Sequence, residues 1–300
     1  EEGVPKKRLG APQRAEGAKR MMADGVKAKR ACWIMGVSTA EPYRAPSADK
    51  DGSLREALQK VWRPNMGYRM AWALVRDGFA PLNLKRVHRV WREMRLSRAR
   101  RHRKKRAGNA VPLRAEAPNQ VWCVDFIHDS CLNGTKLKIL SVVDEFTREC
   151  LALELDTRLN AARVRDVLAP LIEDRGAPGF VRSDNGSEFV ARLLAVFLSE
   201  SGSGSCFIAP GSPWQNGFAE SFHSTLRRDH LDVEAFANLA DAQVKTALYR
   251  RYYNEERPHS SLRYVPPARA CRALESGRAS PSLLPALGMP NSLSTPEVSS

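Results

Sequence analysis

The sequence predicts an α/β fold: a mixed, layered sheet with flanking helices, preceded by small all-α modules. After residue 120, apolar runs typical of strands alternate with amphipathic patterns typical of helices. Between residues 53 and 94, three short segments have helical spacing instead. The 300 residues are enough for one large core with smaller domains attached.

Positive charge is concentrated in the first part of the chain. Residues 1–114 contain 29 Lys and Arg against 10 Asp and Glu, a net charge of +19, while the remaining residues have a net charge of −4. A basic region joined to a nearly neutral one is typical of a polyanion-binding part attached to a catalytic part. An ordinary solvated surface is the alternative interpretation.

Cysteine usage and hydropathy favour a reduced, cytoplasmic protein. The six cysteines form no Cys-x-x-Cys pair and no Cys/His cluster with metal-binding spacing. The sequence contains no run of 18 apolar residues, and its basic start has no apolar signal core, so neither a membrane partner nor secretion is indicated. Because the chain begins with Glu1, we expect a fragment or a reading frame entered by another route.

Residues 1–48 are expected to be a basic segment with disorder over the first twenty residues and a helix over 21–35. A helix-turn-helix remnant and a structural connector are both open for this segment. In residues 49–107 the pattern Ser53 to Glu56 indicates a capping box, and further helices are expected over 68–76 and 84–94, the last capped by Asn83. We interpret residues 49–107 as a helix-turn-helix-type DNA-binding module with a basic linker; a plain helical spacer is the alternative.

A dense basic run ends this module. Residues 95–106 contain eight Lys and Arg in twelve positions, a composition that repels itself. Each neutralised phosphate would release a counterion, so binding would be salt-sensitive and independent of sequence. The residues of the module and run that we expect to contact DNA are Arg69, Lys85, Arg86, Arg103, Lys104 and Lys105.

Residues 108–271 are predicted to form the core. Strands are expected over 121–128, 136–145 and 150–156, with a hairpin signal at Asn133-Gly134. A helix over 161–173, a strand ending at Asp184, a helix over 188–199, a strand over 206–208 and a helix over 239–253 should follow. This order fits an α/β layered sheet. Residues 272–300 are rich in Ser and Pro and are expected to be disordered.

Three acids in the core are candidates for metal chemistry. Asp184 ends a strand before an Asn-Gly turn, and Glu220 begins an amphipathic helix with 35 residues between them. Asp125 lies in the middle of an apolar strand, where a buried charge needs a partner. If they converge, the three carboxylates would form an oxygen cage for Mg²⁺. A satisfied buried acid and a solvated helix residue are the structural alternatives.

Five blocks occur in the order WCVDF, KLKILSVVDEFTREC, VRSDNGSEF, PGSPWQNGFAESFHSTLR and YNEERPHSSL. Together they resemble the integrase-type core of bacterial insertion-sequence transposases, DDE recombinases related to retroviral integrases. Within this family the blocks look like a second-frame product of a two-frame insertion sequence. The resemblance implies a ribonuclease H-like sheet and a catalytic, metal-binding set made of Asp125, Asp184 and Glu220.

The resemblance also implies a transposase that cuts element ends and joins them to target DNA. Two Mg²⁺ ions, for which Mn²⁺ can substitute, would activate water or a 3′-hydroxyl, and Asp125 would bridge both ions. The implied partners are DNA and further copies of the chain in a synaptic complex at the bacterial nucleoid. The motif's basic residue is Arg227, and the loop residues Trp214 and Asn216 are expected to contact DNA.

Two nearby groups are placed outside the catalytic set. His223 is expected to be a surface histidine, and Asp144, at a strand end, is left out because the resemblance assigns catalysis to Asp125. Departures from the family pattern occur at Ser187, Ala247 and Arg263. Open alternatives are a decayed DNA-binding protein that represses transposition and a ribonuclease H-like nuclease, although the basic helical front argues against a plain nuclease.

Overall fold

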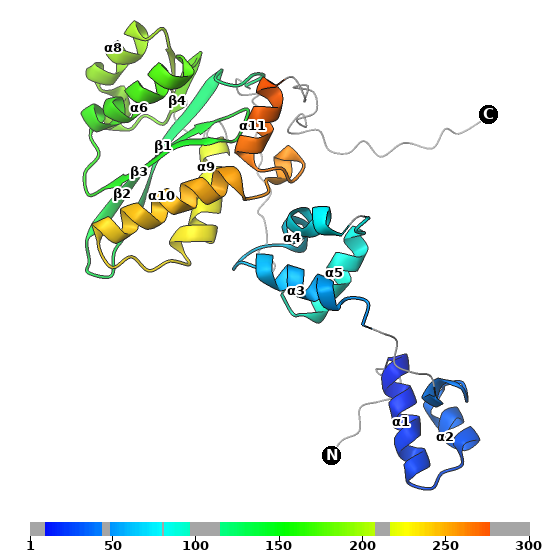
Figure 1. The fold of residues 1–300 in the computed structure, drawn as a ribbon. Helices are drawn as coiled ribbons and strands as arrows, with labels where there is room; N and C mark the ends of the chain where they lie inside the picture. The colour runs from blue at the N-terminus through cyan, green and yellow to red at the C-terminus, as the bar shows by residue number, and fades with distance from the viewer. Residues whose placement is uncertain (1–9, 44–48, 80, 97–114, 208–216, 277–300) are drawn as a thin grey trace, which may run out of the picture. The chain divides into compact units, whose positions relative to one another are not determined.

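The computed structural model describes residues 10–43, 49–79, 81–96, 115–207 and 217–276. The chain divides at Ser53 into two compact units, and each is described by itself (Figure 1). Within the described ranges, no helix combines the length and apolar character needed to cross a membrane.

The first unit is a helical hairpin made of α1 (Ala11–Ala23) and α2 (Ala28–Met35), followed by a 3₁₀ turn, Glu41–Tyr43. Ala18 and Ala31 are fully buried between the helices, where small side chains permit close packing. The prediction of disorder is therefore wrong for residues 11–20. The prediction of one helix over 21–35 is also wrong, because Gly25, with a φ of +89°, turns the chain between α1 and α2.

Three helices form the helical module: α3 (Gly52–Val61), α4 (Tyr68–Val75) with a 3₁₀ turn (Arg76–Gly78), and α5 (Leu84–Glu93). The cap at Asn83 is confirmed, since its Oδ1 accepts the Lys85 amide at 2.8 Å. The capping box is wrong by position, because α3 already begins at Gly52 and Ser53 lies within its first turn. The hydrophobic core of the helical module consists of Leu54, Leu58, Met66, Ala71, Val75, Val87, Val90 and Trp91.

The core contains a five-stranded sheet in the order β3-β2-β1-β4-β5. The strands are β1 (Val121–Ser130), β2 (Lys136–Asp144), β3 (Cys150–Asp156), β4 (Phe180–Ser183) and β5 (Gly204–Phe207). β1, β2 and β3 pair antiparallel, whereas β4 and β5 run parallel to β1. The hairpin at Asn133-Gly134 is confirmed, with Gly134 at a φ of +84°. This sheet confirms the predicted ribonuclease H-like fold class.

Helices cover both faces of the sheet (Figure 1). One face packs on α6 (Ala161–Arg175) and α8 (Arg192–Glu200), which follows the short α7 (Ser187–Val190). The other face packs on α9 (Gly217–Leu226), a π-helical turn (Arg227–Leu231) and α10 (Leu239–Glu255). A 3₁₀ turn (Ser260–Leu262) and α11 (Pro267–Glu275) complete the described core.

Two predicted boundaries are wrong. The helix expected over 188–199 is divided at Ala191, which has an extended ψ of 131° and so interrupts the helical hydrogen bonding. The disorder expected from residue 272 is wrong for residues 272–275, because α11 continues to Glu275 and buries Cys271. Residues 277–300 lie outside the described residues.

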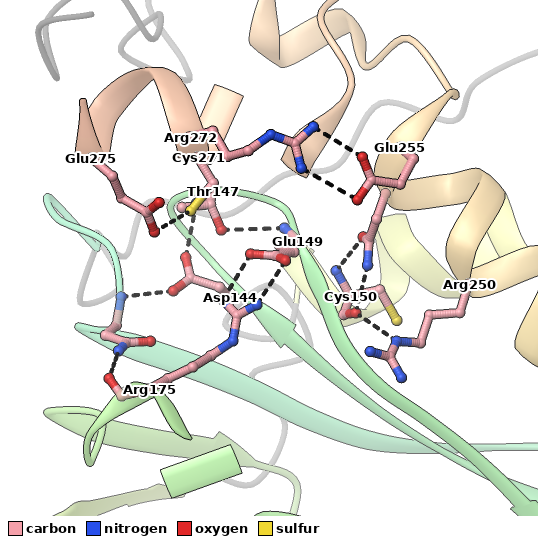
Figure 2. A network of polar contacts seen from close by, with 12 residues as sticks. Asp144, Thr147, Glu149, Cys150, Arg175, Arg250, Glu255, Cys271, Arg272 and Glu275 are labelled. Atoms are coloured by element: carbon pink, nitrogen blue, oxygen red, sulfur yellow. Dashed lines mark hydrogen bonds and ion pairs between the residues drawn. The ribbon is translucent and has the colours of Figure 1, made fainter. Parts of the chain in front are cut away.

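The turn between β2 and β3, residues 144–149, is held by a polar network (Figure 2). The carboxylate of Asp144 accepts the amides of Phe146 and Thr147 at 2.8 Å and that of Asn119 at 2.7 Å. Burial raises the pKa of Asp144, and these three donors act in the opposite direction. The carboxylate of Asp144 is therefore occupied in fixing the backbone of the β2–β3 turn.

Candidate active site

Asp125 lies on β1 and faces α9. In the antiparallel register it is opposite Ser141, and Ile127, which shares its face of the strand, packs in the same cluster as Phe222 and Leu226 of α9. The Asp125 side chain is only 16 % exposed. Its Oδ1 accepts the Phe126 amide at 2.7 Å, so the strand itself orients the carboxylate.

His223 of α9 covers Asp125. Its Nδ1 is 3.9 Å from Asp125 Oδ2, and its Nε2 is 2.8 Å from Ser141 Oγ. Burial lowers the pKa of His223 to about 4, and the nearby charge of Arg227 acts in the same direction. The expectation of a surface histidine is therefore wrong. The signal in the sequence is its position one helical turn after Glu220 and one turn before the buried Leu226.

Asp184 directly follows β4 and is exposed. In the parallel register of β1 and β4, Cys123 is paired with Arg182. Two residues further along the strands, Asp125 and Asp184 come to corresponding positions, and residues two apart on a strand share a face. Asp184 Oδ1 also accepts the Gly186 amide at 3.0 Å, which shapes the Asn-Gly turn.

Glu220 lies in the first turn of α9 and is half-buried, with its Oε2 shielded from solvent. The Cys123 thiol, on the same strand face as Asp125, lies beside the backbone of Ala219. The start of α9, and with it Glu220, therefore lies over the part of β1 that carries Asp125.

The three elements bring the acids to one region of the sheet, but their carboxylates do not meet. Across residues 10–43, 49–79, 81–96, 115–207 and 217–276, no three His, Cys, Asp or Glu side chains are grouped as metal ligands. The chemistry of the donor set nevertheless fits Mg²⁺, since Asp125, Asp184 and Glu220 offer only hard carboxylate oxygens.

Arg227 is the first residue of the π-helical turn that follows α9. α9 runs into this turn without a break, so Glu220 and Arg227 lie on one continuous helical segment. The Arg227 Nη2 donates to the His128 carbonyl at 3.1 Å, on the strand that also carries Asp125. Its side chain is exposed, so the guanidinium is accessible from solvent.

The other expected DNA contacts are on the helical module or outside the described residues. Arg69 of α4 and Lys85 of α5 are exposed, and Arg86 is half-buried. The Arg69 Nε donates to the Tyr68 hydroxyl at 3.3 Å. The positions that lie outside the described residues are Arg103, Lys104, Lys105, Trp214 and Asn216.

Comparisons with known proteins agree with this architecture. A family model described as an integrase core domain matches residues 115–213, a second with the same description matches residues 202–267, and an HTH-like domain model matches residues 48–105. The insertion element IS476 uncharacterized 39.2 kDa protein of Xanthomonas euvesicatoria is 35% identical over 266 residues, covering 86% of this chain and 77% of that protein.

Two further matches complete the comparison. The transposase InsD for insertion element IS2A/D/F/H/I/K of Escherichia coli is 33% identical over 235 residues, covering 72% of this chain and 78% of that protein. Among solved structures, the HTLV-2 integrase catalytic core domain in complex with magnesium (trimeric form) matches with a TM-score of 0.38 and 17% identity, covering 47% of this chain and 89% of that chain. This chain belongs to the insertion-sequence transposases that carry an integrase core domain.

Proposed function

We propose that the chain is a metal-dependent polynucleotidyl transferase that cuts element ends and joins them to target DNA, with Asp125, Asp184 and Glu220 as its catalytic acids. The observation that supports the proposal is the parallel register of β1 and β4, in which Cys123 pairs with Arg182, two residues before Asp125 and Asp184 respectively. Membership of the transposase family supports the same reaction.

Each acid has a distinct task in this proposal. Asp125, on the middle strand of the sheet and oriented by the Phe126 amide, would hold both divalent ions. Asp184 and Glu220 would each complete one site from a turn and from a helix start. Two bound Mg²⁺ ions, or Mn²⁺ in their place, would supply Lewis-acid stabilisation and a lowered pKa of the attacking hydroxyl. His223 and Ser141 would keep water from one side of the Asp125 carboxylate.

The remaining groups would hold DNA. The helical module would bind element ends through Arg69, Lys85 and Arg86, and the basic run with Arg103, Lys104 and Lys105 would neutralise phosphates without reading sequence. Arg227, exposed beside β1, would contact a phosphate near the scissile bond, and Trp214 and Asn216, which precede α9 in the sequence, would also contact DNA. Since two element ends must be held together, we propose that at least two copies assemble on DNA.

A supercoiled plasmid carrying the matching element ends tests this function. With Mg²⁺ the full chain should nick the ends and join them to a target plasmid, giving branched or integrated products. Cutting without joining would favour a nuclease, and binding of the ends without cutting would favour a decayed repressor. Either result would overturn the proposed strand transfer.

A further inference from the structure

A buried ion pair connects the β2–β3 turn to the strand that ends at Asp184. Arg182 donates through Nη1 to both carboxylate oxygens of Glu145, at 2.7 Å and 2.9 Å. The two side chains are 2 % and 0 % exposed. Charge-assisted contacts in so enclosed a place have little freedom to move. Arg182 is two residues before Asp184, so the pair fixes the point at which the Asp184 turn begins.

A second contact connects the same turn to the helix that carries Glu220. The Arg148 guanidinium lies over the Phe218 ring, with its carbon 4.1 Å from the ring centroid, a cation–π distance. Arg148 is 8 % exposed. Phe218 is two residues before Glu220 in the first turn of α9. The contact therefore holds the start of α9 at the level of the β2–β3 turn.

Glu145 connects these contacts. Its amide donates to the Val121 carbonyl at 3.0 Å, at the start of the strand that carries Asp125. Burial raises the pKa of Glu145 to about 7, and the charges of Arg182 and Arg148 act in the opposite direction, so both guanidiniums lie near this carboxyl. One residue is thus tied to β1 by its backbone, to β4 by its side chain and to α9 through Arg148.

We propose that Glu145, Arg182 and Arg148 are positioning residues, which set Asp184 and Glu220 relative to Asp125 so that the three acids can share metal ions. The inference rests on the proposed function. The reason is physical: Asp184 stands on a turn and Glu220 on a helix start, and the three carboxylates repel one another. A rigid connection behind them limits how far the acids separate and lowers the cost of bringing them together around a cation.

The same turn supplies a matched control. Glu149 receives two hydrogen bonds from Arg175, from Nη1 at 2.9 Å and from Nη2 at 2.8 Å (Figure 2). That pair connects the turn to Arg175, the last residue of α6. Glu149→Gln therefore removes a bidentate ion pair from the same turn without touching the contacts that reach Asp184 and Glu220.

The experiment measures Mn²⁺ binding to the full chain by electron paramagnetic resonance, without DNA, beside thermal melting of each variant. Glu145→Gln should weaken Mn²⁺ binding about 10-fold or more, the range for groups that orient metal ligands. Glu149→Gln should lower the melting temperature and leave the Mn²⁺ dissociation constant within about twofold. Equal affinity in the two folded variants overturns the positioning role.

Phe218→Leu tests the positioning role even if Glu145→Gln does not fold. It keeps an apolar side chain and removes the ring beneath Arg148, so it should fold and still weaken Mn²⁺ binding; an unchanged affinity counts against the role of Arg148. Asp184→Asn separates failure of the proposed catalytic site from failure of the proposed positioning role. If wild-type Mn²⁺ binding is insensitive to Asp184→Asn, the proposed catalytic site fails. If it is sensitive to Asp184→Asn and insensitive to both positioning variants, the positioning role alone fails.

Discussion

The helical module and the core use their cations in opposite ways. In the module, Arg69 and Lys85 project from α4 and α5 into solvent. In the core, Arg182 and Arg257 are 2 % and 6 % exposed and form ion pairs with acids on other elements. The electrostatic field of an exposed cation extends into solvent and can attract a polyanion. The field of a buried cation is largely cancelled by the ion-pair partner that offsets its desolvation.

The net charge of a region therefore indicates where DNA can bind, but it does not identify the arginines that bind it. The back half of the chain has a net charge of −4 because it contains 19 Lys and Arg against 23 Asp and Glu. Some of these cations, among them Arg175, Arg182 and Arg257, are paired with acids of the fold. Substitutions in the module should therefore change affinity for DNA, and substitutions in the core should change stability or chemistry.

The largest expected effect comes from the catalytic acids. Asp125→Asn, Asp184→Asn and Glu220→Gln should each reduce strand cleavage by about 10³-fold or more, because an amide keeps the shape and loses the charge that holds Mg²⁺. DNA binding, measured by fluorescence anisotropy, should stay close to wild type, since the affinity comes from the module. A variant that keeps near wild-type joining would remove that residue from the set.

Breaking a buried ion pair of the core should lower the free energy of unfolding, whereas removing an exposed cation of the helical module should leave it nearly unchanged. Arg257 donates to Asp229 at 2.9 Å, with side chains 7% and 12% exposed. Asp229 is also paired with Arg228, whose Nε donates to Asp229 Oδ1 at 2.6 Å. Arg257→Gln therefore removes one of two charged donors from a largely buried carboxylate and should lower the free energy of unfolding by about 1.5–3 kcal/mol in urea titrations. Lys85→Gln should change it by less than about 0.5 kcal/mol. Similar losses in both variants would contradict the division.

Acid should destabilise the core through His230. Its ring stacks on Tyr249 at 4.7 Å and its Nε2 lies 3.2 Å from Thr246 Oγ1, with Phe236 at its edge and the charge of Lys245 nearby. Burial lowers the pKa of His230 to about 4. The unfolded chain binds the proton near pH 6.5, so this contribution is complete above pH 6.5 and is lost as the pH falls toward 4.

The loss should reach on the order of 3 kcal/mol at pH 4, because the pKa of His230 is about 6.5 in the unfolded chain and about 4 in the folded one. His230→Gln should reduce the slope of the unfolding free energy against pH between 6.5 and 4. A smaller slope should remain, because burial also lowers the pKa of His223 to about 4 and that of His259 to about 3. His128→Gln, at an exposed position on β1, is the control and should leave the dependence unchanged. Parallel curves for wild type and His230→Gln would exclude His230 as the source.

The smallest expected effect separates diffuse from local phosphate contacts. Lys85→Gln should weaken binding to all DNA alike and reduce the slope of log affinity against log salt by about one. Arg227→Ala should alter that slope by about one or less, yet reduce joining by about an order of magnitude, because it lies beside the strand of Asp125. If Arg227→Ala leaves joining unchanged, Arg227 acts only as a contact to the His128 carbonyl.

The sequence by itself determined the sheet, the helical module and the three candidate acids. Apolar periodicity places strands and helices because burial drives both, and the Asn133-Gly134 turn and the Asn83 cap depend on local chemistry that a few residues specify. The predicted role of the three acids is a separate matter, since it depends on where bound ions would sit.

The residues that surround those acids could not be predicted from the sequence pattern, because they depend on tertiary contacts. His223 is a polar residue with both buried and exposed neighbours along α9, so the helical pattern does not decide whether it is buried. Its burial depends on how α9 packs against β1, which no local pattern encodes. The same holds for Glu145, which the pattern places at the end of the expected strand 136–145. Its side chain is fully buried against Arg182, 37 positions later in the sequence. Contacts between distant segments depend on strand order and register, and these form only when the whole core packs.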